Sequence, residues 1–230
     1  PAVRGETCAP RRSYLKFEYM TQSLHDARSG LRLGAPLASA RAAVILLHGR
    51  GSSARDMAGL AMALNRETVS FVLPEATNNT WYPQRFLVPA EANEPWLSSA
   101  LDVIETCVNE LLAAGVPSER IGIAGFSQGA CLSLEYALTH PRRYGFVGGL
   151  SGALIGPLER ARPAANLQGT PVLVACAELD AHIPLGHVEQ SVKVFRASGA
   201  EVTRQVYAGS AHTIFPEELS WLKTRVAALA

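Results

Sequence analysis

The sequence has no excess of charge of either sign. Charged residues make up 18% of the 230 residues, and 21 basic side chains stand against 20 acidic ones. The basic residues are scattered, and they form doublets only at Arg11-Arg12 and Arg142-Arg143. Binding to phosphate groups needs a concentrated cationic face. The charge pattern therefore argues against nucleic acid as a partner.

The chain is also poor in cysteine. Its four cysteines are Cys8, Cys107, Cys131 and Cys176. They form no C-x-x-C pair, and none has histidines at zinc-ligand spacing. Two of them, Cys131 and Cys176, fall in segments with core character, where a free thiol behaves as a small apolar group. We therefore expect reduced thiols, no metal site and a cytoplasmic protein.

Long hydrophobic runs are absent as well. No apolar run approaches the roughly 18–20 residues that cross a bilayer, so the sequence predicts no membrane span. Residues 1–20 contain no apolar stretch typical of a secretion signal. The numbering starts at Pro1, which leaves open whether a presequence precedes it.

What the sequence does contain is an alternation of strand-like and helix-like segments. Apolar runs typical of buried strands occur at residues 43–47, 70–73, 121–124, 146–150, 172–175 and 202–207. Helical patterns occur at residues 54–66, 95–114, 128–139, 187–197 and 216–229. Such alternation predicts a mainly parallel sheet with helices on both faces. With 48% apolar residues, the chain is ample for one α/β domain, residues 1–230, and short for two.

Two segments near the N-terminus do not follow this alternation. Residues 14–20 and 31–33 are expected to form a short antiparallel start, joined by a polar turn. Residues 75–94 and 152–170 are irregular and long enough to be functional loops.

Residues 121–138, IGIAGFSQGACLSLEYAL, begin as a strand and end as a helix. Between the two halves, Ser127 lies between Gly125 and Gly129. G-x-S-x-G at a strand-to-helix turn is the nucleophile elbow, which lifts a hydroxyl beyond the carboxyl end of a strand. Glycines are needed on both sides because a Cβ would crowd the neighbouring strand or helix. A glycine-rich chain can contain this pattern by accident, so the hypothesis also requires an acid, a base and oxyanion donors.

Elbow enzymes carry serine, acid and histidine in that order along the chain. The loop after residues 172–175 contains two carboxylates, Glu178 and Asp180. We favour Asp180 as the acid, because Glu178 lies so near the strand end that its side chain is expected to brace the loop. The loop after residues 202–207 contains His212 among small residues. A histidine there can reach the serine, so His212 is predicted to be the base.

The other histidines fit the mechanism less well. His25, His140 and His187 lie in a turn or at helix ends and are expected to be exposed. His182 is too close to Asp180 in sequence to bridge acid and serine, although it is expected to line the site.

An oxyanion hole requires two backbone N–H groups. One is expected from Gln128, directly after the nucleophile, because the helix that begins there points its first amides toward developing negative charge. The second is expected from Arg50, in the glycine-containing segment LHGRGSS at residues 47–53. The alternative is that this segment is only a glycine turn.

Together these motifs resemble the α/β-hydrolases, and more narrowly the phospholipase/carboxylesterase family, which includes acyl-protein thioesterases and small bacterial carboxylesterases. LLHGRG resembles the family's L-H-G-x-G, GFSQGA its elbow, and ELDAHIP its acid loop. Thr80-Trp81-Tyr82 resembles an aromatic pair before the substrate loop. The resemblance runs from residue 43 to the C-terminus. It implies the triad and oxyanion roles assigned above, and no metal or organic cofactor.

Three positions near the predicted site depart from the family pattern. The family commonly has leucine at the position of Arg50 and aspartate at that of Ser52, and Tyr82 is followed by Pro83 in place of an acidic residue. The backbone donor is kept in each case. An arginine at the mouth of the site nevertheless changes the charge that a substrate meets.

The sequence thus predicts a serine hydrolase without a large cap domain, acting on a small-molecule ester. Its expected substrates have short to medium acyl chains and simple or aromatic alcohols. Trp81, Tyr82 and Ile183 are the expected substrate-binding residues, whereas Phe86 and Trp96 are expected to pack their own loop.

Three alternatives remain open from the sequence. An acyl-thioesterase and a lysophospholipase-like enzyme would use the same triad. A non-catalytic binding module on this fold would typically have lost a triad member, and none is missing here. The sequence is also compatible with a homodimer.

Overall fold

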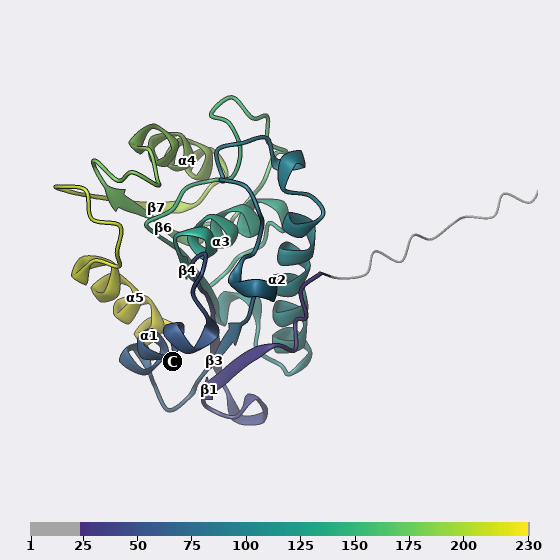
Figure 1. The fold of residues 1–230 in the computed structure, drawn as a ribbon. Coiled ribbons are helices and arrows are strands. Elements are labelled where there is room, and N and C mark those ends of the chain that lie inside the picture. Colours follow the sequence, from purple (N-terminus) through teal and green to yellow (C-terminus); the bar gives the residue numbers. More distant parts are fainter. Residues whose placement is uncertain (1–23, 230) are drawn as a thin grey trace, which may run out of the picture.

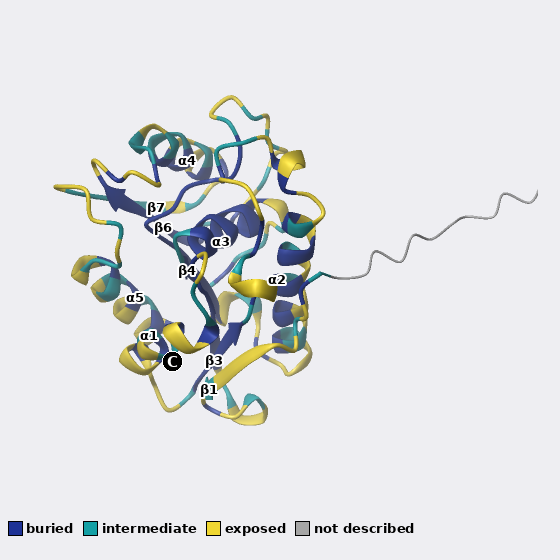
Figure 2. Ribbon diagram, viewed as in Figure 1, coloured by how far each residue is buried: buried dark blue, intermediate teal, exposed yellow. Residues whose placement is uncertain are grey.

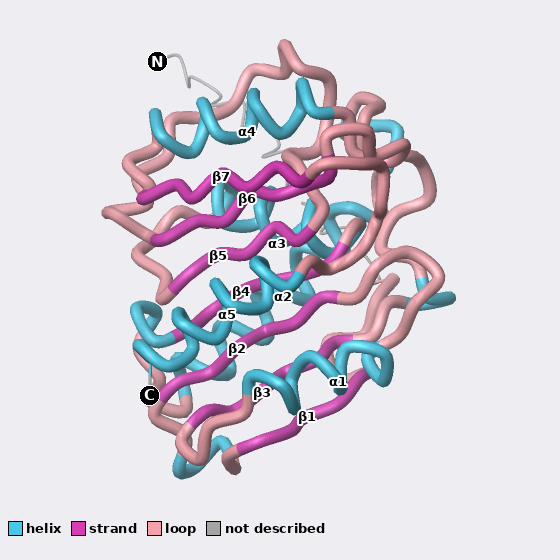
Figure 3. Tube along the Cα trace, turned by 90° about the vertical axis from the view of Figure 1, so that its left-hand side faces the viewer, coloured by secondary structure: helices cyan, strands magenta, loops and turns pink. Residues whose placement is uncertain are grey.

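The computed structural model describes residues 24–229, and its centre is a seven-stranded sheet in the order β1-β3-β2-β4-β5-β6-β7 (Figure 3). All neighbouring strands are parallel except β1 and β3. The strands are β1 (Gly30–Gly34), β2 (Ala42–Leu47), β3 (Val69–Pro74), β4 (Ile121–Phe126), β5 (Phe146–Leu150), β6 (Pro171–Ala177) and β7 (Glu201–Tyr207). The predicted mainly parallel sheet is confirmed.

Helices cover both faces of the sheet (Figure 1). They are α1 (Ala54–Leu64), α2 (Trp96–Ala113), α3 (Gln128–Thr139), α4 (Leu185–Ala197) and α5 (Pro216–Leu229). Short 3₁₀ turns are η1 (Leu37–Ser39), η2 (Thr77–Asn79), η3 (Ala90–Asn93) and η4 (Ser118–Arg120). The helices α1 and α5 pack on one face, and α2, α3 and α4 pack on the other.

The alternation of side chains along each strand explains the two layers. On β2, Ile45 and Leu47 belong to the core beneath α2, α3 and α4, whereas Val44 and Leu46 belong to the core beneath α1 and α5. Successive side chains of a strand point to opposite faces, so a strand that is apolar throughout needs helices on both sides. All six residues of β2 are buried, and the neighbouring strand β4 is likewise dark blue in Figure 2.

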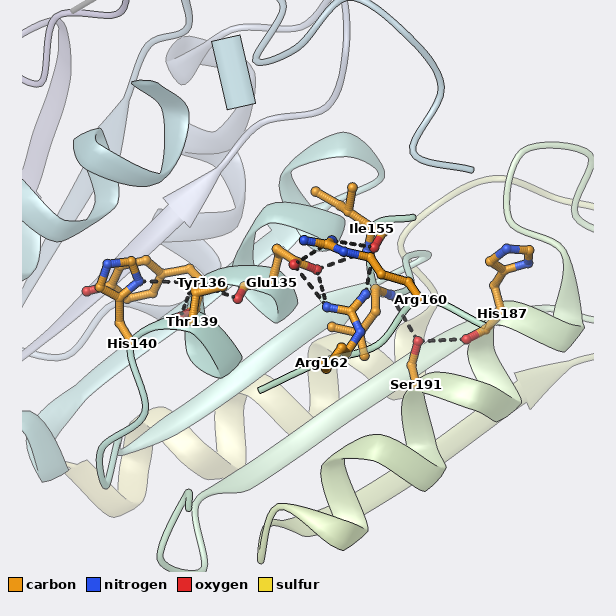
Figure 4. A network of polar contacts seen from close by, with 10 residues as sticks. Glu135, Tyr136, Thr139, His140, Ile155, Arg160, Arg162, His187 and Ser191 are labelled. Carbon is orange, nitrogen blue, oxygen red and sulfur yellow. Dashed lines mark hydrogen bonds and ion pairs between the residues drawn. The ribbon is translucent and has the colours of Figure 1, made fainter. Parts of the chain in front are cut away.

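Helix α3 is buried around its circumference, from Gln128 to Leu138. The long loop between β5 and β6 covers part of it through the buried carboxylate of Glu135 (Figure 4). That carboxylate accepts hydrogen bonds from Arg160 at 2.8 Å, from Arg162 at 2.8 Å and from the Ile155 backbone N–H at 3.1 Å. A buried charge is tolerated when it is paired and hydrogen-bonded in this way. Helix α3, which follows the elbow, is therefore packed against the rest of the protein on all sides.

The N-terminal prediction is only partly met. Residues 31–33 do form a strand, but β1 pairs antiparallel with β3, with Leu31 opposite Leu73. Its predicted partner, residues 14–20, lies outside the described residues. Among the helices of residues 24–229, none combines the length and hydrophobicity needed to cross a membrane.

Candidate active site

Ser127 occupies the turn between β4 and α3. Its backbone has φ 55° and ψ −113°, a conformation that side-chain-bearing residues rarely adopt. Two backbone hydrogen bonds hold it there, from Ser127 N–H to the Leu150 carbonyl and from Cys131 N–H to the Ser127 carbonyl, both 3.0 Å. The turn directs the hydroxyl away from the sheet and into a cavity that Ser127 lines.

The two glycines of the elbow are steric requirements. A Cβ on Gly125 would lie 2.4 Å from the carbonyl carbon of Gly129. A Cβ on Gly129 would lie 2.3 Å from the carbonyl oxygen of Leu47. Both contacts are with backbone atoms, which cannot move aside without displacing β2 or α3. The strand and helix can approach this closely only because both side chains are absent.

The structure brings Ser127, His212 and Asp180 together in one hydrogen-bonded chain. His212 Nε2 lies 2.8 Å from Ser127 Oγ, and His212 Nδ1 lies 2.7 Å from Asp180 Oδ2. A carboxylate only accepts hydrogen bonds, so Nδ1 donates to it and Nε2 keeps its lone pair for the serine proton. This is the tautomer that a general base at Ser127 needs.

Asp180 is fixed from its other side as well. Its Oδ1 accepts the backbone N–H groups of His182 at 2.7 Å and Ile183 at 3.1 Å. The Asp180 side chain is 0% exposed, whereas that of His212 is 19% exposed. Glu178 is exposed, and its backbone N–H, not its side chain, ties the loop to the carbonyl of Tyr207 at 2.8 Å. The preference for Asp180 over Glu178 thus agrees with their positions.

The His212 loop is exposed over most of its length and is anchored by two residues that the sequence did not single out. Ser151, with φ 49°, donates from its hydroxyl to the Thr213 carbonyl at 2.8 Å. Glu218 accepts the backbone N–H of Phe215 at 2.8 Å and that of Ser151 at 3.4 Å. Burial of Glu218 raises the pKa of its carboxyl to about 7. No local motif marks Ser151, because its partners Thr213 and Glu218 are distant in sequence. Glu218 makes one local bond, to Phe215, but its contact with Ser151 joins residues 67 positions apart.

Both predicted oxyanion donors lie at the cavity. Gln128 is the first residue of α3 and directly follows Ser127. Arg50 follows Gly49, whose backbone lies so close to the serine that a Cβ added to Gly49 would be 3.4 Å from Ser127 Cβ. Both Arg50 and Gln128 line the cavity. Within residues 24–229, neither the Arg50 nor the Gln128 backbone N–H donates to another protein group. Two such amides beside a nucleophile are suited to bind the oxygen of a tetrahedral intermediate.

The Gln128 side chain has a second role that the sequence did not predict. Its Oε1 accepts the Trp81 backbone N–H at 2.9 Å, and its Nε2 donates to the Tyr82 carbonyl at 2.8 Å. The residue after the nucleophile therefore also holds the loop that borders the cavity.

Trp81 does not line the cavity, so its prediction as a substrate-binding residue is wrong. It is 0% exposed, and its indole N–H donates to the His48 carbonyl at 2.9 Å. The rings of His25 and His48 lie 5.5 Å and 5.0 Å from it, centroid to centroid. The Trp81 side chain thus packs beneath its own loop, although it was expected to face the substrate.

His25 is buried, contrary to the prediction that it is exposed. Its Nε2 donates to the Trp81 carbonyl at 2.9 Å, and its Nδ1 accepts the Thr77 backbone N–H at 3.1 Å. His48 similarly accepts the Ala76 backbone N–H at 3.0 Å through Nε2. Burial lowers the pKa of both imidazoles, which favours the neutral forms that these bonds require.

The cavity at Ser127 has a volume of about 380 Å³. Two of the predicted substrate-binding residues, Tyr82 and Ile183, border it. Phe86 borders it too, although it was expected only to pack its own loop, and so does Phe126. A larger hollow of about 490 Å³ beside β7 and α5 has no histidine or cysteine in its lining.

Cys131 also borders the cavity, but it is not a competing nucleophile. Burial raises the pKa of its thiol to about 12, so the reactive thiolate is not formed near neutral pH. Residues 24–229 contain no group of three or more His, Cys, Asp or Glu side chains placed to hold a metal ion.

A mainly parallel sheet with a serine elbow after β4, an acid after β6 and a histidine after β7 defines an α/β hydrolase. A family model described as Phospholipase/Carboxylesterase matches residues 31–230. The chain belongs to this family, and it is a hydrolase of the esterase or thioesterase type.

Relatives cover nearly the whole chain. Acyl-protein thioesterase 1 of Saccharomyces cerevisiae is 29% identical over an alignment of 215 positions, and the alignment covers 83% of this chain and 94% of the yeast protein. Acyl-protein thioesterase 1 of Eremothecium gossypii is 31% identical over an alignment of 220 positions, which covers 84% of this chain and 90% of that protein. The crystal structure of a phospholipase/carboxylesterase from Dyadobacter fermentans is 37% identical, with a TM-score of 0.83 over 88% of this chain and 97% of the other.

Proposed function

We propose that this protein hydrolyses carboxylic esters with short to medium acyl chains and simple or aromatic alcohols, through an acyl-enzyme at Ser127. The observation that carries the proposal is the hydrogen-bonded chain from Ser127 Oγ through His212 to Asp180, which opens into the cavity. In this hydrogen-bonded chain, Ser127 Oγ can donate its proton to His212 Nε2, and His212 Nδ1 donates to the Asp180 carboxylate, as acyl transfer requires.

In the first half of the reaction, His212 Nε2 takes the proton of Ser127 Oγ while the oxygen attacks the substrate carbonyl carbon. The imidazole becomes cationic, and the Asp180 carboxylate stabilises it across the 2.7 Å contact. The carbonyl oxygen acquires negative charge, which the backbone N–H groups of Arg50 and Gln128 bind. His212 then gives its proton to the leaving alcohol, and the acyl group remains on Ser127.

The second half repeats these steps with water. His212 removes a proton from a water molecule as it attacks the acyl carbonyl, and the same amides bind the second oxyanion. Collapse of this intermediate returns the proton to Ser127 Oγ and releases the carboxylic acid.

The dimensions and walls of the cavity support the proposed chain length. About 380 Å³ is near the lower end of the roughly 300–1,000 Å³ found for small-molecule sites. Tyr82, Phe86 and Ile183 supply apolar walls, and these suit an acyl or aryl group. Each extra methylene that fits adds about 0.8 kcal/mol, so preference should rise with chain length until the cavity is full.

Thioester hydrolysis is the second candidate, because the two fungal relatives are named acyl-protein thioesterase 1. The same residues would serve, and a thiolate, with a pKa near 8.5, needs less protonation by His212 to leave than an alkoxide does. A series of p-nitrophenyl esters from acetate to decanoate, run beside matched acyl thioesters, decides between the two by their ratio of kcat/KM.

The Ser127→Ala variant tests the assignment of the nucleophile. We expect its turnover to fall by roughly 10⁴-fold or more while the fold is kept, since triad members act as a unit. Circular dichroism and thermal unfolding provide the control for folding. Turnover equal to that of the unaltered enzyme, in a preparation free of contaminating esterases, would refute the proposal.

A further inference from the structure

The charged side chains that border the cavity are both arginines, Arg50 and Arg85. No aspartate or glutamate is among the residues that the structure places in the lining. The catalytic Asp180 lies behind His212, is fully buried, and accepts three hydrogen bonds. The lining of the cavity therefore carries two positive side chains and no carboxylate. The exposed carboxylate of Asp56 lies outside the lining and accepts the hydroxyl of Ser52 at 2.8 Å.

The guanidinium of Arg50 is held in place by backbone carbonyls of the irregular segment at residues 75–94, here called the substrate loop. It donates from Nη1 to the Pro83 carbonyl at 2.8 Å and from Nη2 to the Gln84 carbonyl at 2.6 Å. Its central carbon lies 5.8 Å from the centroid of the Tyr82 ring. A guanidinium has five N–H donors, so three remain for a ligand.

Arg85 reaches across from the same loop to the acid loop, where its Nη2 lies 3.4 Å from the Ala181 carbonyl. Within residues 24–229, neither Arg85 nor Arg50 has a carboxylate within ion-pair distance. Arg160 and Arg162, in contrast, both pair with Glu135. The two arginines at the cavity thus carry charge that the described part of the protein does not neutralise.

We propose that the preferred substrate carries a negatively charged group, a carboxylate or a phosphate, a few bonds from the scissile carbonyl. Arg50 and Arg85 bind this group while Ser127 attacks the ester. The planar fork of a guanidinium matches the oxygens of both anions, and charge-assisted hydrogen bonds are stronger than neutral ones. This inference rests on the proposed hydrolysis at Ser127 and specifies its substrate class.

Two matched substrate pairs test the proposal. Mono-p-nitrophenyl adipate and p-nitrophenyl hexanoate have the same six-carbon acyl chain with and without a terminal carboxylate. Monobutyryl glycerol phosphate and monobutyrin carry the difference on the alcohol side. We expect kcat/KM for the anionic member of at least one pair to exceed that of its neutral partner by roughly tenfold, after subtraction of uncatalysed hydrolysis.

The variant Arg85→Gln should lower this anionic-to-neutral ratio by roughly tenfold, Arg85→Lys should lower it less, and Arg50→Gln should also lower it. The ratio compares two substrates in one variant, so a general loss of activity cancels. Arg66→Gln is the matched control, because it removes one exposed arginine outside the cavity lining and should leave the ratio unchanged. Raising the salt from about 0.1 M to about 1 M should lower the ratio in the unaltered enzyme.

The results separate this inference from the proposed function. Suppose that Ser127-dependent hydrolysis of the neutral esters is found, but the anionic-to-neutral ratio of kcat/KM is near one or is unchanged by Arg85→Gln. This result would overturn the inference and leave the proposed esterase activity intact. An absence of hydrolysis of all four compounds would overturn the esterase and the inference with it.

Discussion

Replacement of Asp180 by asparagine tests the orientation of the catalytic imidazole directly. In the native site, Oδ1 accepts two backbone N–H groups, from His182 at 2.7 Å and Ile183 at 3.1 Å. An asparagine must place its amide oxygen at that position, because its NH₂ group would meet two donors there. The NH₂ group therefore takes the position of Oδ2, which is 2.7 Å from His212 Nδ1.

This exchange reverses the hydrogen bond to the histidine. The NH₂ group donates, so His212 Nδ1 must accept and the ring proton moves to Nε2, which faces Ser127 Oγ at 2.8 Å. A protonated Nε2 cannot take the serine proton. We expect Asp180→Asn to lower kcat/KM by roughly 10³- to 10⁴-fold, equivalent to about 4–5.5 kcal/mol of transition-state stabilisation.

The matched control is Glu178→Gln, two residues away on the same loop. Glu178 is exposed, and its carboxylate is outside the hydrogen-bonded chain, so its kcat/KM should change less than about twofold. Both variants are assayed with p-nitrophenyl butyrate at one pH, and thermal unfolding checks that each is folded. A larger loss in Glu178→Gln, or a loss below about tenfold in Asp180→Asn, would refute the assignment of the acid.

Two further predictions concern buried residues near the site. Trp81→Ala should lower the free energy of unfolding by about 3–5 kcal/mol and reduce kcat/KM equally for short and long esters. If kcat/KM instead changed with acyl-chain length and the stability stayed the same, Trp81 would contact the substrate after all. Glu218 has a pKa raised from 4.5 to about 7, so the folded protein binds its proton more tightly than the unfolded chain. As the pH rises from about 4.5 to about 7, the free energy of unfolding should fall by about 3 kcal/mol, and this pH dependence should be absent in Glu218→Gln. The free energy of unfolding is measured by urea denaturation across this pH range. The same pH dependence in both proteins would contradict the role of the buried carboxyl.

The core of the fold and the order of the catalytic residues were predictable because they depend on local patterns. Runs such as residues 43–47 are short and apolar throughout, as is typical of a strand covered on both faces. Ser127, Asp180 and His212 each follow a strand, and parallel strands bring their carboxyl ends to one edge of the sheet. Chain order and strand polarity were therefore sufficient to bring these residues together.

The direction of loop side chains was not predictable in the same way. Trp81 and Phe86 are both aromatic residues of one irregular loop, and no period tells which of them faces the cavity. Trp81 turns inward because the His48 carbonyl and the Gln128 side chain hold its indole and backbone, and both partners are distant in sequence. The pairing of β1 with β3 escaped prediction for a similar reason, since a short strand is compatible with several neighbours.

The burial of His25 sets a practical limit on shortening this enzyme. The region matched by the family begins at residue 31, yet His25 secures the Trp81 carbonyl and the Thr77 amide, and the Leu24 carbonyl accepts the Thr77 hydroxyl at 2.7 Å. A protein that begins at residue 31 would keep every catalytic side chain, but it would lose the hydrogen bonds of Leu24 and His25 to Thr77 and Trp81. We therefore expect a protein that begins at residue 31 to be less stable than one that keeps Leu24 and His25.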